Sequence, residues 1–532
     1  MSKNNNNNNL KKEKKVELDS KITRFGYIIN KKSLSELQIN EIKKDLTAKP
    51  FRMGNFAKFA KDNSFPVYIE NGDYISIPKY YGIERFGNPR VNRIENYDFP
   101  SYDMRYLGEL RPKQRIIVDK VFKGFDEGRG GLLIAGCGSG KTNMAIYLAC
   151  HYKLKTLFIV HKTFLKNQII NRIVSTTNID KVGVIQQKQV EVNQPFVVAM
   201  VQSLVSRDYD DSIFKDFGMI IIDEVHHMGA RNFSKVYQKI STKYMLGISA
   251  ERQRNDGMYK IINWYMGPIL HAEEQIPNDM VVVKKFHYST SNEKRIEMII
   301  NKYTGEPDRS TMITNLVHIK YRNKFILKLI KELFDDGKNI LILSGRLKQV
   351  DLMYKLLNKN KYTKGNVGKY IGSMNEESLA ISATKQIILG TYEMAQEGLD
   401  IGHLNVVILC TPKSQIKQAI GRILRAEIYE EHPIVIDIVD DDNSVFKQQS
   451  NKRDAYYEKQ HYNVQHFKVA DYKKKKYMKY DDKKGIRKAL AQVPKAKNKN
   501  NDKDGKKPYQ SNYVPKVYKP MNCKEIDFSD EE

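Results

Sequence analysis

Between about residues 102 and 465, short apolar runs repeatedly precede a polar or glycine-containing turn and then a helical pattern. This order is typical of buried parallel strands that are joined by crossover helices. The pattern predicts an α/β fold with two parallel-sheet domains in tandem, which we place at residues 102–278 and 279–467. The predicted strands of the two domains are Gly131–Ala135, Thr156–Val160, Phe196–Met200, Met219–Asp223 and Met245–Ser249, and then Asn339–Ser344, Gln386–Gly390, Val406–Cys410 and Ile434–Val439.

The regions that flank these domains have different patterns. Residues 16–101 alternate short apolar patches with turn signals, which predicts a small N-terminal α+β accessory domain. Residues 1–15 combine a run of asparagines with lysines, and residues 468–532 are rich in lysine. Because both compositions bury little apolar surface, we predict disordered basic tails. Tyrosines lie among the C-terminal lysines, which favours an arm that binds polyphosphate and stacks on bases over a merely solubilising segment.

The charge balance narrows the choice of partners. The formal net charge is +28, which favours a polyanion and nucleic acid above all. A membrane surface would also attract such a chain, but no run of about 18 apolar residues is present. We therefore expect a soluble intracellular protein without a membrane partner. The four cysteines are too scattered to indicate a zinc site or a disulfide framework.

A glycine-rich octapeptide follows the first predicted strand and precedes a helical segment. Strand, glycine-rich loop and helix in this order form a phosphate-binding loop, because glycines let backbone N–H groups and the helix N-terminus face the phosphates. Lys141 would reach the β and γ phosphates, and Thr142 would ligate Mg²⁺. The sequence therefore predicts a site for ATP and Mg²⁺ made by Ala135, Gly136, Cys137, Gly138, Ser139, Gly140, Lys141 and Thr142.

Two adjacent acids, Asp223 and Glu224, end the apolar run that begins at Met219. At the carboxyl end of a buried strand, Asp223 can hold Mg²⁺ through water and Glu224 can polarise the attacking water. A solvated turn is the alternative, but such a turn need not follow an apolar run. His226 and His227 come next, and no zinc site is predicted there because no third ligand is evident.

Polar residues on either side extend the predicted nucleotide site. Gln114, together with Arg111, precedes the loop and could read the adenine edge. In the second domain, Arg422 and Arg425 lie three apart and share one helical face. Guanidinium groups that cross a domain interface can stabilise charge on the γ-phosphate, a role worth about 10³ to 10⁵ in rate. An ordinary amphipathic helix with a basic face is the alternative.

In the order of these features the chain resembles the superfamily 2 helicases over about residues 102–465. The resemblance implies two RecA-like domains that hydrolyse ATP with Mg²⁺ and move on nucleic acid. Segments similar to the family's motifs Ia, Ib, III, IV and V are residues 160–168, 201–204, 247–250, 340–351 and 390–400. By the same resemblance, nucleic-acid contacts fall to His161, Lys162, Thr163, Gln202, Ser203 and Thr391, and further nucleotide contacts to Gln418 and Asp400.

Smaller features are similar to one branch of that superfamily: the poxvirus-type transcript-release helicases, their giant-virus relatives and a phage recombination helicase. These features are residues 254–257, Trp264 before residues 267–268, and residues 437–440 with Arg453 and Tyr457. The branch implies a viral protein of the virion and host cytoplasm. It also implies a role in transcription or recombination, with RNA polymerase as a candidate partner.

One position departs from the family pattern. The family usually has Ser/Thr-Ala-Thr-Pro where this chain has Ser249, Ala250, Glu251 and Arg252. Glu251 could hydrogen-bond as the threonine would, or it could repel phosphate and uncouple hydrolysis from strand movement. The sequence leaves both outcomes open.

These features together predict an ATP-dependent helicase or translocase that acts on DNA, with RNA or a DNA–RNA hybrid as other substrates. One alternative is a double-strand DNA translocase that does not unwind, which would share every motif. A second alternative is an inactive nucleic-acid-binding scaffold. The intact set of Lys141, Asp223, Glu224, Arg422 and Arg425 argues against the scaffold.

Overall fold

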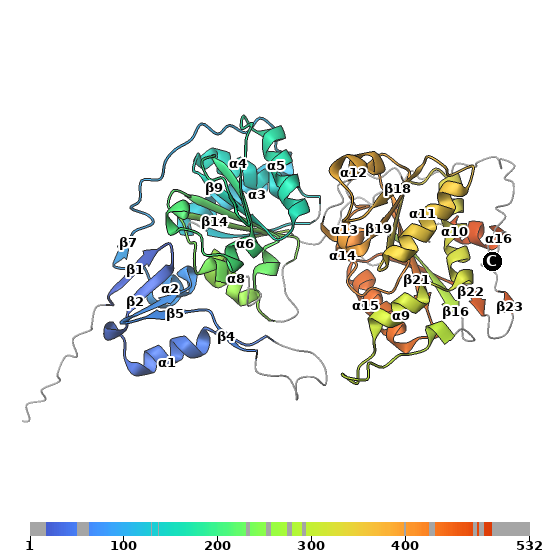
Figure 1. Cartoon of the computed structure of the whole chain (residues 1–532), viewed down its shortest axis with the longest axis horizontal. Coiled ribbons are helices and arrows are strands. Elements are labelled where there is room, and N and C mark those ends of the chain that lie inside the picture. The colour runs from blue at the N-terminus through green and yellow to red at the C-terminus, as the bar shows by residue number, and fades with distance from the viewer. Residues whose placement is uncertain are drawn as a thin grey trace, which may run out of the picture. The chain divides into compact units, whose positions relative to one another are not determined.

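The computed structural model divides into two compact units, with the break between residues 274 and 275 (Figure 1). No helix in the part of the chain that the structure describes is long and apolar enough to cross a membrane. The described residues are 18–50, 63–128, 130–136, 138–229, 235–251, 257–273, 279–289, 294–397, 401–424, 431–471, 476–477 and 483–491.

The first unit begins with a five-stranded sheet in the order β5-β6-β2-β1-β7. Its helices are α1 (Glu36–Asp45), which Ser35 and Gln38 cap by exchanging hydrogen bonds, and α2 (Lys79–Phe86). The predicted α+β accessory fold is thus confirmed. Its strands are β1 (Ser20–Thr23), β2 (Gly26–Asn30), β5 (Ile69–Asn71), β6 (Tyr74–Ile77) and β7 (Val91–Asn92), with a separate pair β3 (Thr47–Ala48) and β4 (Phe65–Pro66).

An eight-stranded sheet in the order β11-β10-β12-β9-β13-β14-β8-β15 forms the rest of this unit, and only the β10–β11 pair is antiparallel. Its strands are β8 (Gly130–Ile134), β9 (Thr156–Val160), β10 (Gly183–Gln186), β11 (Gln189–Val190), β12 (Phe196–Met200), β13 (Met219–Asp223), β14 (Tyr244–Ser249) and β15 (Ile269–Ala272). Its helices are α3 (Pro112–Gly128), α4 (Lys141–Tyr152), α5 (Thr163–Thr176), α6 (Val201–Ser206) and α8 (Tyr259–Met266). The five strands predicted here are all present.

The register of this sheet brings the predicted site residues to one edge. Asp223 pairs with Ile248, and Ser249 pairs with Ile134, the last residue before the glycine-rich loop. Since parallel strands end at the same edge, the loop and the ends of β13 and β14 lie together.

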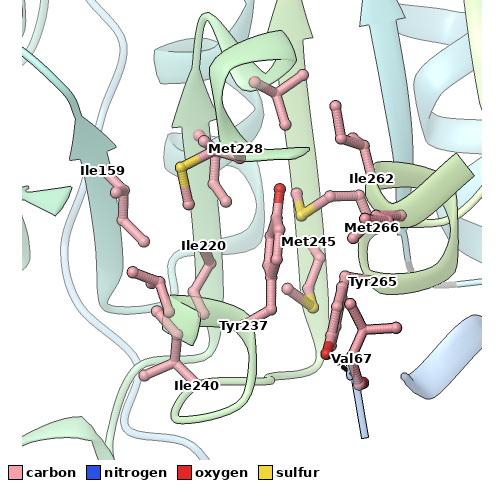
Figure 2. Close-up of a cluster of buried hydrophobic side chains, with 14 of the residues drawn as sticks. Val67, Ile159, Ile220, Met228, Tyr237, Ile240, Met245, Ile262, Tyr265 and Met266 are labelled. Atoms are coloured by element: carbon pink, nitrogen blue, oxygen red, sulfur yellow. Dashed lines mark hydrogen bonds between the residues drawn. The ribbon is translucent and has the colours of Figure 1, made fainter. Parts of the chain in front are cut away.

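The accessory domain shares a core with the large sheet. Alternate residues of β13 face opposite sides: Ile221 packs in the core with α3 to α5, whereas Ile220 belongs to the core that contains Val67 of the accessory domain. Figure 2 shows Tyr237 and Tyr265 in that second core, and the Tyr265 hydroxyl donates a hydrogen bond of 2.8 Å to the Val67 carbonyl. The accessory domain therefore packs against α8 and extends the core on that side of the sheet.

The second unit contains another eight-stranded sheet, in the order β18-β19-β17-β20-β21-β16-β22-β23, which is parallel except for the β22–β23 pair. Its strands are β16 (Val282–Ser289), β17 (Ile340–Ser344), β18 (Val367–Tyr370), β19 (Ile387–Thr391), β20 (Val406–Leu409), β21 (Ile434–Asp440), β22 (Asn463–Asp471) and β23 (Lys476–Tyr477). Its helices are α9 (Arg309–Leu316), α10 (Lys320–Asp335), α11 (Leu347–Lys359), α12 (Glu376–Ala383), α13 (Tyr392–Glu397), α14 (Lys417–Ile420), α15 (Ser444–Lys459) and α16 (Lys483–Leu490). The four strands predicted for this domain are all present, so the fold class is confirmed.

The predicted start of the C-terminal tail at residue 468 is wrong. β22 continues to residue 471 beside β16, and α16 buries Ile486 and Ala489 in the core of the second unit. The Lys284 ammonium, whose pKa burial lowers to about 8, donates to the Ala489 carbonyl at 2.8 Å. The high lysine content conceals this segment in the sequence, because the apolar face of α16 is only a few residues wide.

Candidate nucleotide and nucleic-acid site

The glycine-rich loop connects β8 to α4 as predicted from the strand–loop–helix order. Gly138 and Gly140 have φ angles of 81° and 82°, in the left-handed region that favours glycine. A Cβ added at Gly140 would also lie 2.1 Å from the Gln114 amide nitrogen. The loop therefore curls tightly before Lys141 and Thr142, the first two residues of α4.

Three groups of the loop suit a bound polyphosphate. The Lys141 ammonium donates hydrogen bonds of 2.9 Å to the carbonyls of Ala135 and Gly136. The Ser139 hydroxyl is buried and has no hydrogen-bond partner among the described residues. The Gly136 N–H donates to a Glu273 carboxylate oxygen at 2.7 Å, so it already holds an anionic oxygen. Cys137, also predicted for this site, lies outside the described residues.

Arg111 and Gln114 contact the loop from the start of α3. The Gln114 side chain donates to the Ser139 carbonyl at 2.8 Å and accepts from the Arg111 N–H at 2.9 Å. The Arg111 guanidinium donates to the Gly138 carbonyl at 3.1 Å. Both ends of the Gln114 amide thus have partners within the protein, and the two residues brace the loop. Their contact with adenine stays a prediction.

The two acids of the site lie at the end of β13. Glu224 has a φ of 47°, an uncommon conformation for a side chain of this size, and its N–H donates to an Asp223 carboxylate oxygen at 2.9 Å. Desolvation and the neighbouring Glu224 raise the pKa of Asp223 to about 6, although the charge of Lys141 opposes this shift. Desolvation would also raise the pKa of Glu224, but His226 and Lys141 outweigh it and lower that pKa to about 2. Glu224 therefore loses its proton at a much lower pH than Asp223 and is ionised at neutral pH.

His226 joins these acids to the end of β14. Its Nδ1 lies 2.9 Å from the Ser249 hydroxyl and 3.2 Å from a Glu224 carboxylate oxygen. Its Nε2 lies 3.9 Å from the Glu251 carboxylate, which is too far for a hydrogen bond. Ser249 also accepts a hydrogen bond of 3.0 Å from the Glu251 N–H. Arg252, the other half of the family departure, lies outside the described residues.

The residues predicted to contact nucleic acid fall into two groups. The exposed Gln202, at the start of α6, donates to the His161 carbonyl at 2.6 Å, so the segments like motifs Ia and Ib meet. The His161 ring lies 4.3 Å from that of His227, and Lys162 and Thr163 begin α5. Ser203, however, is buried and its hydroxyl accepts from the Gln187 N–H at 2.9 Å. The contact of Ser203 with nucleic acid stays a prediction.

The predicted residues of the second unit lie on neighbouring segments. Thr391 ends β19, Gln418 is on α14, and Arg422 follows that helix by two residues. The Arg422 guanidinium donates to the Ala395 carbonyl of α13, so the arginine-bearing segment contacts the segment that follows Thr391. Arg425 and Asp400 lie outside the described residues.

One residue of the first site was not predicted. Glu273 reaches the glycine-rich loop because β15 pairs with β8, which places residue 273 beside the end of β8. The four-residue strand β15 gave no strong signal in the sequence. Only the pairing of strands that are far apart in the chain identifies Glu273.

Comparisons with known proteins give two family matches and several similar proteins. Residues 107–254 match the family described as the res subunit of type III restriction enzymes, and residues 322–427 match the helicase conserved C-terminal domain. The chain is similar to a protein of Acanthamoeba polyphaga mimivirus provisionally named an ATP-dependent RNA helicase, with 60% identity over 97% of this chain and 99% of that relative. A provisionally named helicase of Invertebrate iridescent virus 6 is 24% identical over 67% of this chain and 83% of its own length. The crystal structure of T4 UvsW aligns with 18% identity over 85% of this chain and 99% of that chain, at a TM-score of 0.34.

Proposed function

The chain belongs to the superfamily 2 helicases of the giant-virus type, which hydrolyse ATP, and from that premise we propose that it moves on DNA during viral transcription. The observation that supports this proposal best is the grouping of Lys141, Asp223 and Glu224 at one edge of a parallel sheet.

Each group at this edge has a chemical role in the proposal. Lys141 and the loop N–H groups hold the β and γ phosphates of ATP, while Thr142 and Asp223 hold Mg²⁺, which neutralises phosphate charge when bound. Glu224 is ionised because its pKa is held near 2, so its carboxylate can orient and polarise the attacking water. Arg422 and Arg425 stabilise the charge that develops on the γ-phosphate, with Gln418 and Asp400 as further nucleotide contacts.

For nucleic acid we propose a surface formed by His161, Lys162, Thr163 and Gln202, with Thr391 as the contact of the second domain. The Gln202–His161 hydrogen bond supports the first part, because it fixes two loops at the carboxyl edge of the sheet, where open parallel sheets bind their ligands.

Two substrate classes compete, and each has its own support. The similarity to transcript-release helicases favours DNA, and an RNA polymerase is then the partner class. The name of the mimivirus relative, an ATP-dependent RNA helicase, favours RNA. We propose DNA. A comparison of ATP hydrolysis with single-stranded DNA, duplex DNA and RNA decides between them, and stimulation by RNA alone would reject DNA. The same panel with a triplex-displacement assay identifies a translocase that does not unwind.

The nucleotide assignment has a direct test in Lys141→Ala. This variant should lose nucleic-acid-stimulated ATP hydrolysis by about 10³-fold or more, because the phosphates lose their principal cation. Thermal unfolding should be unchanged, since the hydrogen bonds of the Lys141 ammonium within the described residues go to loop carbonyls. Retained stimulated turnover in the folded variant would reject the assignment.

Truncation at residue 468 would remove α16 and the end of β22, which belong to the fold, so substitutions are the better test of the basic C-terminal region. Lys483, Lys484 and Lys488 are exposed on α16, so their replacement by Gln removes charge without removing the core contacts of Ile486 and Ala489. If α16 binds phosphates, the slope of log affinity against log salt should flatten by up to about 0.9 per contact on duplex DNA. An unchanged slope would assign α16 a structural role alone.

A further inference from the structure

The loop between β20 and α14 is held at three points by three separate segments of the second unit. The Gly345 N–H, just after β17, donates to the Thr411 hydroxyl at 2.8 Å. The Tyr392 hydroxyl donates to the Thr411 carbonyl at 2.7 Å. The Arg453 guanidinium, from α15, donates to the Lys413 carbonyl at 2.9 Å. The Tyr392 and Arg453 side chains thus fix the backbone at Thr411 and Lys413, ahead of Gln418 and Arg422 in the chain.

Tyr392 connects this loop directly to the segment that resembles motif V. It follows Thr391 in the chain and begins α13, and its side chain is only 3% exposed. Its ring also lies 6.0 Å from the Lys413 ammonium, at the other anchored residue of the loop. A displacement of Thr391 would therefore be transmitted to the loop through the buried Tyr392 side chain.

Arg453 is itself fixed by a buried ion pair. Its Nε and Nη2 donate to the two carboxylate oxygens of Asp437 at 2.9 and 2.8 Å, and Tyr457 donates to the same carboxylate at 3.0 Å. Asp437 is fully buried and Arg453 is 2% exposed. A guanidinium held by two parallel hydrogen bonds has little freedom to turn, so its remaining N–H group has a fixed direction toward the Lys413 carbonyl.

A purely structural role is the alternative, since buried ion pairs and tyrosines occur in many cores. The location of these contacts, next to the predicted site residues of the second unit, favours a functional role in addition. After α14, the Arg422 guanidinium donates to the Ala395 carbonyl of α13. Residues of α13 are therefore hydrogen-bonded to the chain both before and after α14. In Figure 1, α13, α14 and α15 lie beside one another in the second unit.

We propose that Tyr392 and Arg453 are positioning residues that set Gln418 and Arg422 relative to Thr391, and thereby link contact with the nucleic-acid strand to ATP hydrolysis. The inference rests on the proposed function, because it assigns to Arg422 the stabilisation of γ-phosphate charge. Neither residue contacts ATP in this proposal.

The chain offers a matched pair of variants for the test. Tyr392→Phe removes the hydrogen bond to Thr411 and keeps the ring. Tyr265→Phe removes the hydrogen bond of a similarly buried hydroxyl to the Val67 carbonyl in the first unit, and leaves Asp437 and residues 411–413 untouched. Both should lower the melting temperature by a similar amount, about 2 to 4 °C, since each loses one buried hydrogen bond. Only Tyr392→Phe should lower the kcat of nucleic-acid-stimulated ATP hydrolysis, by about tenfold, with the KM for ATP within about twofold.

Arg453→Lys gives a second measurement of the same link. A lysine keeps a cation beside Asp437 but cannot bond the carboxylate and the Lys413 carbonyl with one planar group, so it should also lower kcat more than KM. Equal kcat values for Tyr392→Phe and Tyr265→Phe would overturn the inference while leaving the proposed function intact. A wild-type chain without stimulated ATP hydrolysis would instead reject the proposed function, and the inference with it.

Discussion

Asp223 and Asp437 both lie on strands of mostly apolar residues, but the charges around the two carboxylates differ. Burial would raise the pKa of Asp437, yet Arg453, Lys285 and Tyr457 outweigh it and keep that pKa below its ordinary value. Asp223 forms no ion pair among the described residues, and desolvation together with Glu224 raises its pKa to about 6. A carboxylate whose partners are built into the fold is structural, whereas one with uncompensated charge has affinity for a cation that the fold does not supply.

The largest expected effect is on activity at Asp223. Asp223→Asn should reduce nucleic-acid-stimulated ATP hydrolysis by about 10³-fold, because an amide carries no charge to hold Mg²⁺. Its melting temperature should stay the same or rise, since the substitution removes a charge without a partner. Steady-state ATPase assays measure the loss of activity, and thermal unfolding measures the melting temperature. Loss of the fold in Asp223→Asn would show that Asp223 is a structural residue like Asp437.

Asp437→Asn should have the opposite outcome. It leaves the Arg453 guanidinium buried without its counter-charge, which costs on the order of 3 to 5 kcal/mol in unfolding free energy. Tyr457→Phe, which removes one neutral donor from the same carboxylate, should cost about 1 kcal/mol and serves as the control. Chemical denaturation measures both variants. An Asp437→Asn variant as stable as the wild type would show that the Asp437–Arg453 ion pair does not stabilise the fold.

The pH dependence of stability should also separate the two aspartates, with a smaller effect. The folded-state pKa of Asp223, about 6, lies above its unfolded value, so ionisation favours the unfolded chain as pH rises from about 4 to 6. Asp223→Asn should therefore gain stability relative to the wild type across that interval, by on the order of 1 to 3 kcal/mol. Asp437 has a lowered pKa, so its contribution is present above about pH 4 and disappears only in stronger acid. Denaturation in EDTA from pH 4 to 7 tests this, and parallel curves for Asp223→Asn and the wild type would contradict it.

The same contrast explains what the sequence could predict. The strands and the glycine-rich loop were predictable, because an apolar run and a turn of glycines specify local structure. The acids at residues 223 and 224 were predictable because they directly follow such a run. The ion pair of Asp437 with Arg453, and the approach of Glu273 to the loop, depend on packing between distant segments, and no local pattern encodes them. The order of residues 483–491 was missed because their lysines dominate the composition.

The smallest expected effect concerns Glu251, which stands where the family has a threonine. His226 Nδ1 lies 2.9 Å from the Ser249 hydroxyl, whereas its Nε2 lies 3.9 Å from the Glu251 carboxylate, whose side chain is 38% exposed. Ser249→Ala should thus lower stimulated ATP hydrolysis about tenfold, by losing a buried hydrogen bond beside Glu224. Glu251→Thr should change the same rate by less than about threefold, because screening weakens an exposed charge at that distance. The measurement is the ratio of strand displacement to ATP hydrolysed for both variants. A tenfold rise in that ratio for Glu251→Thr would mean that the glutamate itself weakens the coupling of ATP hydrolysis to strand movement.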